Sequence, residues 1–426
     1  MNFGYNALIF LYHFLWTVGG LLVLPLAPVL RKKRVFRRLW PSLPRESLRG
    51  GGIWIHALSV GEVISAVPLA NRLASELTHT ELVFTVSTAK GMAVAREKLH
   101  GNVRLLLTMP LDAWWAVRPV ARFIRPSLFV LVETDIWPGL LDYLHRRGVK
   151  AVLVNGRVSP RTFRSYKKAS FFVRRMLGSL DACLMQSDLD CERLFRIGVD
   201  SEKVRRVGNI KFDREWRPMA PEERRARLVE ISLSEAHVIW VAGSTHPGEE
   251  TLILEVFKAL LPVYPHLRLI LAPRQVGRGS AIGREARNMG LEAVLRTKMR
   301  HPAGDYRVLV LNTLGELGRF YGLGGIGFVG GSLVPFGGHN LLEPAAFGCP
   351  VLFGPHTHNF VDMSESLIAS GGGRRVADAG ELSAAMAMLL SDEALRAGMG
   401  ARAVRFVREN RGAVERIVQY LETTDG

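Results

Sequence analysis

The stretch IWIHALSVGEVISAVPLA, residues 53–70, contains the strand-to-helix transition that most of the chain repeats. Residues 53–56 indicate a short buried strand, and after ALSVGE the apolar residues recur with the period of an amphipathic helix. Glu62 falls in the first turn of that helix. Ser59 and Glu62 match a capping box, in which each side chain binds a backbone N–H that the helix leaves without a partner. Taken alone, the stretch favours a cap, and a catalytic carboxylate is the alternative.

The same alternation of short apolar strands and amphipathic helices runs through two halves of the chain. Apolar runs without strict alternation are typical of parallel strands that helices cover on both faces. We therefore predict an α/β protein with two doubly wound, Rossmann-like halves that face each other across a cleft. Strands are expected at residues 53–56, 82–86, 104–107, 128–132, 151–154, 182–185, 204–207, 238–244, 267–274, 307–312, 326–332 and 350–354. Helices are expected between them, among others at 62–77, 112–124, 188–197 and 393–421.

The boundaries of the two halves follow from composition. Residues 212–234 are polar and charged and include Pro218 and Pro221, so they are expected to connect the halves. Together with the N-terminal features below, this predicts five regions. They are a membrane anchor over 1–30, a basic juxtamembrane segment over 31–49, an N-terminal domain over 50–215, a linker over 216–235 and a C-terminal domain with a terminal helix over 236–426.

The first thirty residues indicate attachment to a membrane. Residues 6–30 contain no Asp, Glu, Lys or Arg, and about twenty apolar residues are enough to cross a bilayer core. Residues 31–49 then carry eight basic residues and one acid. A secretory signal would carry its positive charge before the apolar run, whereas the positive-inside rule predicts that everything downstream is cytoplasmic. A buried core helix and a helix lying in the membrane interface are the alternatives, and His13 favours the interface.

The charge of the whole chain points to an anionic partner. The 426 residues carry a net charge of +17, with a pI near 10.3. Nucleic acid, an anionic membrane surface and a phosphorylated substrate all suit such a balance. Cys183, Cys191 and Cys349 are scattered, which argues against a disulfide framework or a zinc site and fits a reducing compartment.

The second half concentrates polar residues at the ends of its strands, where doubly wound sheets bind ligands. The stretches are AGSTHPGEE (242–250), APRQ (272–275) and FVGGSLVPFGGHNLLEPAAFG (328–348). Glycines allow a ligand to approach the backbone, and a helix N-terminus offers N–H groups to a phosphate. Glu343 could accept hydrogen bonds from ribose hydroxyls, or Asn340 and Glu343 could simply cap a helix. The cluster predicts a nucleotide site.

Three other stretches have both a structural and a functional interpretation. Asp188 and Asp190 resemble a metal-binding DxD, but they follow Ser187 at a helix start, and caps are favoured. Residues 157–175 hold seven basic residues and no acid, which suits either a solvated face or a surface for phosphates and anionic lipid. Glu133, with Asp135 nearby, follows one strand, and Lys211 follows another. The carboxylate and the lysine are either a structural salt bridge or active-site groups.

These strings together resemble the 3-deoxy-D-manno-octulosonic acid (Kdo) transferases of lipopolysaccharide synthesis. The similar pieces are the N-terminal anchor, HALSVGE, VETDIWP, VNGRVS, QSDLDCERL, GNIKFD, GSTHPGEE, APR, LGELG, FVGGSLVPFGGHNLLEPAAFG and FGPHTHNF, in the expected order up to about residue 360. Three positions depart from the family pattern. Asp135 stands where Glu is usual, Gly156 where Ala is usual, and Leu314 where Met is usual, which puts only that side-chain contact in doubt.

The resemblance implies a GT-B fold and a metal-independent, inverting glycosyltransferase without a cofactor. The donor would be CMP-Kdo, and the acceptor a hydroxyl of the lipid A precursor (lipid IVA) at the cytoplasmic side of the inner membrane. Glu62 would be the general base, and Glu133 and Lys211 would stabilise the transition state. The CMP contacts would be Pro273, Arg274, Leu314, Gly315, Glu316, Asn340, Leu341, Leu342 and Glu343. One, two or more transferred Kdo residues are compatible with these motifs.

The chemistry agrees with these residues. An acceptor hydroxyl must lose its proton as it attacks the anomeric carbon, so a carboxylate base is needed. The departing CMP gains negative charge, which Arg274 and helix N-termini can stabilise. Two other functions stay open at this point. They are a sugar-nucleotide epimerase, which shares the two-domain architecture, and a non-enzymatic, membrane-tethered anion or nucleic-acid binder, although no nucleic-acid module is recognisable.

Overall fold

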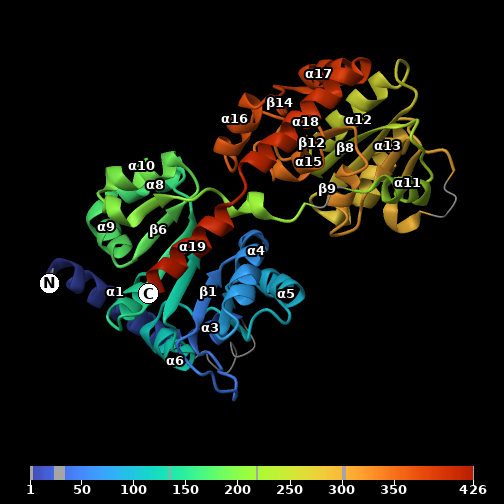
Figure 1. Ribbon diagram of the computed structural model, residues 1–426. Coiled ribbons are helices and arrows are strands. Elements are labelled where there is room, and N and C mark those ends of the chain that lie inside the picture. Colours follow the sequence, from blue (N-terminus) through green and yellow to red (C-terminus); the bar gives the residue numbers. More distant parts are fainter. Residues whose placement is uncertain (1–2, 24–33, 134–135, 217–218, 300–303, 426) are drawn as a thin grey trace. The chain divides into compact units, whose positions relative to one another are not determined.

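The computed structural model describes residues 3–23, 34–133, 136–216, 219–299 and 304–425, which form two α/β units (Figure 1). The first unit contains the chain up to Arg214 and the C-terminal segment 410–426, and the second contains residues 215–409. Residues 1–2 and 24–30 of the expected anchor, residues 31–33 of the basic segment, Asp135, and residues 217–218 of the expected linker, which include Pro218, lie outside the described residues. Each unit has its own parallel sheet and core, so the prediction of two Rossmann-like domains is confirmed.

The first unit is built on seven parallel strands in the order β3-β2-β1-β4-β5-β6-β7. The order reverses between β1 and β4, where Ile53 pairs with Leu128. Apart from β3, β7 and the exposed first residue of β5, the strands are buried, because helices cover both faces of the sheet. The strands are β1 (Ile53–Ala57), β2 (Leu82–Val86), β3 (Leu105–Thr108), β4 (Leu128–Val132), β5 (Lys150–Gly156), β6 (Ala182–Met185) and β7 (Val204–Arg206).

Hydroxyl side chains begin several helices of this unit. The N-cap residues Ser59, Thr88, Ser159 and Ser187 each accept a hydrogen bond from a backbone N–H of the first turn. The helices are α1 (Phe3–Val23), α3 (Arg34–Leu39), α4 (Val60–Glu76), α5 (Ala89–Lys98), α6 (Trp114–Ile124), α7 (Pro138–His145), α8 (Pro160–Lys168), α9 (Ser170–Gly178), α10 (Asp188–Ile197) and α19 (Ala413–Asp425), with short 3-10 helices η2 (Ser201–Lys203) and η3 (Ile210–Asp213).

The second unit repeats the design with seven parallel strands in the order β10-β11-β9-β8-β12-β13-β14. Its order reverses between β8 and β12. The strands are β8 (Val238–Thr245), β9 (Leu267–Pro273), β10 (Ala293–Leu295), β11 (Val308–Val310), β12 (Ile326–Val329), β13 (Val351–Phe353) and β14 (Gly373–Arg375). The helices are α11 (Pro221–Glu230), α12 (Glu249–Leu260), α13 (Gly279–Asn288), α14 (Leu317–Tyr321), α15 (Leu342–Ala346), α16 (Val361–Ala369), α17 (Ala379–Ser391) and α18 (Glu393–Glu409), with η4 (Val276–Arg278) and η5 (Arg296–Lys298).

The expected linker over residues 216–235 is corrected, because most of it is part of the second unit. Residues 221–230 form α11. Leu228, Ile231 and Leu233 are buried in a core cluster of that unit. Their three apolar side chains lie among many charged neighbours, which explains why composition alone suggested a connection.

The end of the chain is also corrected, because the single helix expected over 393–421 is two helices in different units. Gly412 has a φ of +93°, which separates α18 from α19. Asp213 of the first unit then accepts hydrogen bonds from the backbone N–H groups of Gly412 and Val414, each at 2.6 Å. Ile417 and Leu421 of α19 are buried in the core of the first unit, beside α4 (Figure 1).

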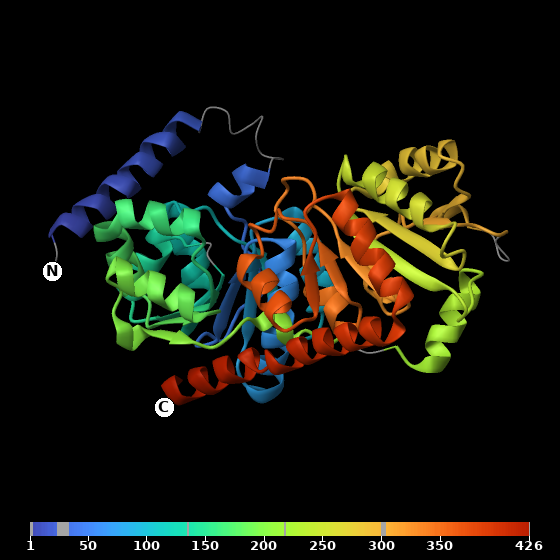
Figure 2. The same ribbon diagram turned by 90° about the horizontal axis from the view of Figure 1, so that it is seen from above.

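Helix α1 packs along the outside of the first unit (Figure 2). Tyr5 and Ile9 are buried in this contact. Farther along, the Tyr12 hydroxyl donates to Asp112 Oδ2 over 2.8 Å. These contacts hold a large part of the helix against the unit.

The opposite face of α1 is apolar and exposed. Phe10, Leu15 and Leu22 are 72%, 60% and 73% exposed. α1 is long and apolar enough to cross a membrane, and only 17% of its most apolar window is buried. The alternative of a buried core helix therefore does not apply to α1.

Candidate active site

Glu62 lies in the first turn of α4, just beyond the carboxyl end of β1. Its carboxylate accepts a hydrogen bond from the backbone N–H of Leu58 over 2.6 Å and one from the hydroxyl of Ser59 over 3.3 Å. The hydroxyl of Ser59 accepts from the backbone N–H of Glu62, so the predicted cap is present. A carboxylate can accept about four hydrogen bonds, so capping and catalysis are compatible. The cap fixes the orientation of the carboxylate where the order of the sheet reverses.

Glu133 and Lys211 form an ion pair at the same edge of the sheet. Glu133 directly follows β4, and Lys211 belongs to η3, which follows β7 and packs against α4. Lys211 Nζ lies 2.7 Å from Glu133 Oε1, with the side chains 28% and 17% exposed. The ion pair predicted as one of two alternatives is therefore formed, and it borders the helix that carries Glu62.

Asn155, which sequence reasoning missed as a site residue, supports this pair from the end of β5. Its side chain is fully buried, donates to Glu133 Oε1 over 3.3 Å and accepts from the backbone N–H of Ile210 over 3.1 Å. Gln186, after β6, donates to the Asn155 carbonyl and accepts from the side chain of Asn209, both over 2.9 Å. A polar network thus joins the carboxyl ends of β4, β5, β6 and β7.

The backbone at two members of this network is strained. Glu133 and Asn155 have φ values of +61° and +55°. Such a conformation costs on the order of 1–3 kcal/mol for a non-glycine residue and concentrates at functional sites. The sequence carried a signal for the network, because a polar residue directly follows the apolar strand in VNGR (154–157) and MQS (185–187).

In the second unit, Glu249 organises the turns after β8 and β12, between which the strand order reverses. Its carboxylate is fully buried and accepts from the backbone N–H groups of residues 331–333 at 2.6, 2.9 and 2.8 Å. The two turns approach closely at Gly330, where a Cβ atom would lie 2.6 Å from the carbonyl oxygen of Ser244. The predicted nucleotide turn is therefore a rigid loop at the switch point of the second sheet.

Two histidines contact each other beside this loop. Nε2 of His246 and Nε2 of His339 are 2.8 Å apart, and their rings stack with centroids 5.1 Å apart. Burial, followed by the charge of Arg274 and the contact with His246, lowers the pKa of His339 to about 4. Burial also lowers the pKa of His246, which Glu249 partly offsets. Both rings are therefore neutral near pH 7, and the cations that act on the pair are Arg274 and Arg278.

Helices α14 and α15 bring two of the expected CMP-binding turns together. Glu316 is the N-cap of α14 and accepts hydrogen bonds from Thr313 and, over 3.2 Å, from Arg296. Burial acts to raise the pKa of Glu316, but these two donors outweigh it and leave the pKa below its usual value. Glu343 lies against α14, because a Cβ atom at Gly318 would be 2.7 Å from Glu343 Oε1.

The other expected CMP contacts lie in the same turns. Pro273 ends β9, and the exposed side chain of Arg274 follows it. Leu314 is 82% exposed, and Gly315 has a φ of +82°.

Asn340 caps differently from the expectation. Its Oδ1 accepts from the backbone N–H of Leu342 over 3.2 Å, and the N-cap of α15 is Leu341. The side chains of Leu341 and Leu342 are buried, so any contact of these two residues with a ligand would use their backbone.

The DLD stretch, residues 188–190, has a structural role. Asp190 is buried and accepts from the backbone N–H of Val158 over 2.8 Å and from the hydroxyl of Ser187 over 2.6 Å. Asp188 is 83% exposed and lies 3.6 Å from Arg206. In the described part of the chain, no cluster of three or more His, Cys, Asp or Glu side chains could hold a metal ion.

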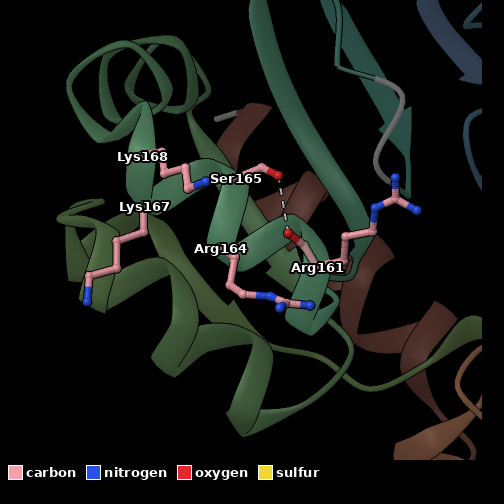
Figure 3. Close-up of a pocket in the computed structure, with 5 residues that line it drawn as sticks. All are labelled: Arg161, Arg164, Ser165, Lys167 and Lys168. Carbon is pink, nitrogen blue, oxygen red and sulfur yellow. Dashed lines mark hydrogen bonds between the residues drawn. The ribbon is translucent and has the colours of Figure 1, made fainter.

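The basic stretch forms an exposed surface on α8. Arg161, Arg164, Lys167 and Lys168 line a shallow hollow of about 560 Å³ together with Ser165. Figure 3 shows their side chains spreading from the helix rather than converging on one point. This arrangement suits a broad anionic surface better than a single phosphate group.

Comparison with known proteins identifies the family. The family model of the 3-Deoxy-D-manno-octulosonic-acid transferase (kdotransferase) matches residues 31–214. A 3-deoxy-D-manno-octulosonic acid transferase of Haemophilus influenzae is 33% identical over 87% of this chain and 86% of its own length. One of Aquifex aeolicus is 31% identical over 82% of this chain and 89% of its own length.

Solved structures agree on the fold. UDP-GlcNAc 2-epimerase from Neisseria meningitidis bound to UDP-GlcNAc matches with a TM-score of 0.63, covering 87% of this chain and 100% of its own, at 12% identity. At that identity the likeness concerns the two-domain, GT-B-like fold alone. The relatives, by contrast, are similar in sequence along nearly their whole length. The chain therefore belongs to the 3-deoxy-D-manno-octulosonic acid (Kdo) transferase family and is a glycosyltransferase.

Proposed function

We propose that this enzyme transfers Kdo from CMP-Kdo to a hydroxyl of the lipid A precursor, lipid IVA, by a single displacement that inverts the anomeric centre. The observation that carries the proposal is the grouping of Glu62 with the Glu133–Lys211 pair around the switch point of the first sheet. The identity of the transferred sugar is inferred from the names of the relatives.

Glu62 is the proposed general base. The attacking hydroxyl loses its proton as its oxygen bonds to the anomeric carbon of Kdo, and the bond from that carbon to the phosphate of CMP breaks. The bonds from Leu58 and Ser59 aim the carboxylate in advance, so no reorientation is needed during the reaction.

Glu133 and Lys211 are proposed to stabilise the transition state. Lys211 is a cation held in place by Glu133, and a positioned ammonium can pair with the carboxylate of the sugar. Asn155 acts as a positioning residue, because its hydrogen bonds to Glu133 and to the backbone of Ile210 hold the two members of the pair beside each other.

The donor is proposed to bind in the second unit, at the turns that carry Pro273, Leu314–Glu316 and Asn340–Glu343. Arg274, beside the neutral histidine pair, would face the phosphate of CMP. Glu343 would accept hydrogen bonds from the ribose hydroxyls, as a carboxylate in a first helical turn can do.

The acceptor is proposed to reach the first unit from the cytoplasmic face of the inner membrane. The exposed apolar face of α1 suits a helix that lies in the interface, and the basic side chains of α8 suit anionic head groups. We favour a helix that lies in the membrane interface because α1 packs against α7. If α1 crossed the bilayer in this arrangement, α7 would enter the bilayer with it.

The test is to incubate the purified enzyme with CMP-Kdo and lipid IVA and to weigh the lipid product by mass spectrometry. A mass increase of one or more Kdo residues is expected, and it counts the sugars. Release of CMP without a lipid product would contradict the acceptor, and conversion of a sugar nucleotide without an acceptor would favour an epimerase.

A further inference from the structure

A second basic site lies in the first unit, away from the proposed chemistry. A cavity of about 440 Å³ is lined by the start of α1, the end of α7 and the length of α9. Three arginines line it, Arg146, Arg174 and Arg175, and a single acid, Asp142. The cavity is therefore cationic.

The arginines are not equivalent. Arg146 is paired with Asp142 over 2.7 Å and also donates to Asn6 of α1 over 3.0 Å. Neither Arg174 nor Arg175 forms an ion pair with any acid that the structure describes. These two guanidinium groups are available to an anion, and guanidinium binds phosphate oxygens particularly well.

Tyr5 supplies a second and independent sign of a ligand. Its side chain is only 6% exposed and lines the cavity, yet its hydroxyl is buried without a hydrogen-bond partner. Burial, followed by the charge of Asp142, raises the pKa of this hydroxyl to about 12; Arg146 and Arg175 act to lower it, and Asp112 also acts to raise it. Buried tyrosine hydroxyls usually have a partner, and an acceptor oxygen in the cavity would provide one.

The surroundings indicate what carries that oxygen. Phe171, an aromatic side chain that also lines the cavity, is 48% exposed. A molecule with a phosphate and apolar chains would satisfy both the cavity and its rim. A membrane phospholipid has these two parts at the depth where an interfacial helix lies.

The reacting acceptor is a less suitable occupant because of where the cavity lies. α7 ends at His145 and α9 at Gly178, before the amino ends of β5 and β6. Glu133 and Lys211 follow the carboxyl ends of strands in the same sheet. The seven residues of β5 alone separate the two edges by roughly 20 Å, at about 3.3 Å per residue.

We propose that the cavity between α1, α7 and α9 binds the phosphate of an anionic membrane phospholipid, with Tyr5, Arg174 and Arg175 as its donors. The bound lipid fastens α1 to the unit and the unit to the membrane surface. The inference rests on the membrane association proposed above. Arginines near a helix end also counter the helix dipole, and that role alone would leave lipid affinity unchanged on removing the Tyr5 hydroxyl.

The test measures binding of the full-length enzyme to phosphatidylcholine vesicles with and without phosphatidylglycerol. Tyr5→Phe keeps the ring that lies 5.8 Å from Phe172 and removes only the hydroxyl. We expect it to weaken binding to the phosphatidylglycerol vesicles about tenfold, the usual effect of one hydrogen bond to a charged group, and to leave thermal stability and binding to phosphatidylcholine unchanged. The control is the double variant Lys90→Gln with Arg96→Gln, which removes two positive charges from the exposed side of α5. The double variant Arg174→Gln with Arg175→Gln removes the same charge and should weaken binding to phosphatidylglycerol more than the control does.

Four results would overturn the proposal, and they are distinguishable. Unchanged binding of Tyr5→Phe, with the two arginine changes no worse than the α5 control, would remove this site and leave membrane association intact. A parent enzyme that bound neither vesicle would overturn membrane association as well, while transfer measured in detergent would still report the chemistry. A raised KM for lipid IVA in Tyr5→Phe, with unchanged phosphatidylglycerol binding, would assign the cavity to the acceptor, and tight binding of inorganic phosphate alone would assign it to a free anion.

Discussion

Replacing Glu62 by Gln separates the observed role of this side chain as a helix cap from its proposed role as the general base. Gln can still serve in a capping box, so α4 and the thermal stability should change little. Gln cannot accept a proton, so kcat should fall by about 10²–10⁴, the usual contribution of a general base. Steady-state transfer assays and thermal unfolding check both parts.

The companion variant Glu62→Ala removes the cap as well and should cost about 1 kcal/mol of folding free energy. A Gln variant as active as the parent would exclude Glu62 as the base, and Glu133 would be the next carboxylate to examine.

Glu343→Ala should weaken CMP binding by about 1–3 kcal/mol, the range for removing one partner from buried hydroxyls. Isothermal calorimetry with CMP checks this, and Glu365→Ala, on an exposed helix of the same unit, is the control. If the variant folded and bound CMP like the parent, Glu343 would be a structural residue of the contact between α14 and α15.

The histidine pair predicts how the stability of the second unit depends on pH. The folded state lowers the pKa of His339 to about 4, whereas an unfolded histidine titrates near 6.5. Between these values the unfolded state binds more protons, so this stabilisation is complete above about pH 6.5 and is lost as the pH falls toward 4. His339→Asn should flatten that part of the unfolding profile, and equal slopes in parent and variant would contradict the neutral pair.

Among the elements, α19 depends on a cap from a distant part of the sequence. Asp213→Ala removes both hydrogen bonds to its N-terminus and should cost the first unit about 0.5–2 kcal/mol. Hydrogen exchange should rise in β1 and α4 and stay constant in β8. The matched control is Asp378→Ala, which uncaps α17 and should have the opposite distribution.

The elements themselves were largely predictable where burial is continuous. Strands such as Leu82–Val86 and Ala182–Met185 have the expected bounds, because long apolar runs between polar turns have few other interpretations. β10 and β14 were not expected, because each has only three residues at the edge of a sheet, and Gly373–Arg375 carries no apolar run.

The site was predictable only in part. Glu62, Glu133 and Lys211 each follow a strand, which marks them in the sequence. Asn155 and the loop that Glu249 holds depend on contacts between segments distant in sequence. The prediction of a single helix over 393–421 was wrong because the chain turns at Gly412 and the next helix is capped by Asp213, some two hundred residues away.

For the whole molecule, the second unit is one continuous segment and the first is not. Residues 215–409 expressed alone should fold and bind CMP with the affinity of the full chain, because every expected CMP contact lies within them. Residues 1–214 alone should expose the surface that Ile417 and Leu421 normally cover, and should gain stability when a peptide of residues 410–426 is added. Circular dichroism and calorimetry on the fragments test this, and loss of CMP binding in the isolated segment would contradict it.

The position of α19 in the first unit also affects the order in which the two units can fold during translation. Most of the first unit is translated before the second unit, yet its core helix α19 is translated after all of residues 215–409. Domains usually complete their folding from the N-terminus during synthesis, but here the second unit can close first. During translation η3, with Lys211, therefore still lacks the helix that packs against it while the second unit is being made. The surroundings of Lys211 therefore become complete only after the whole second unit and α19 have been translated.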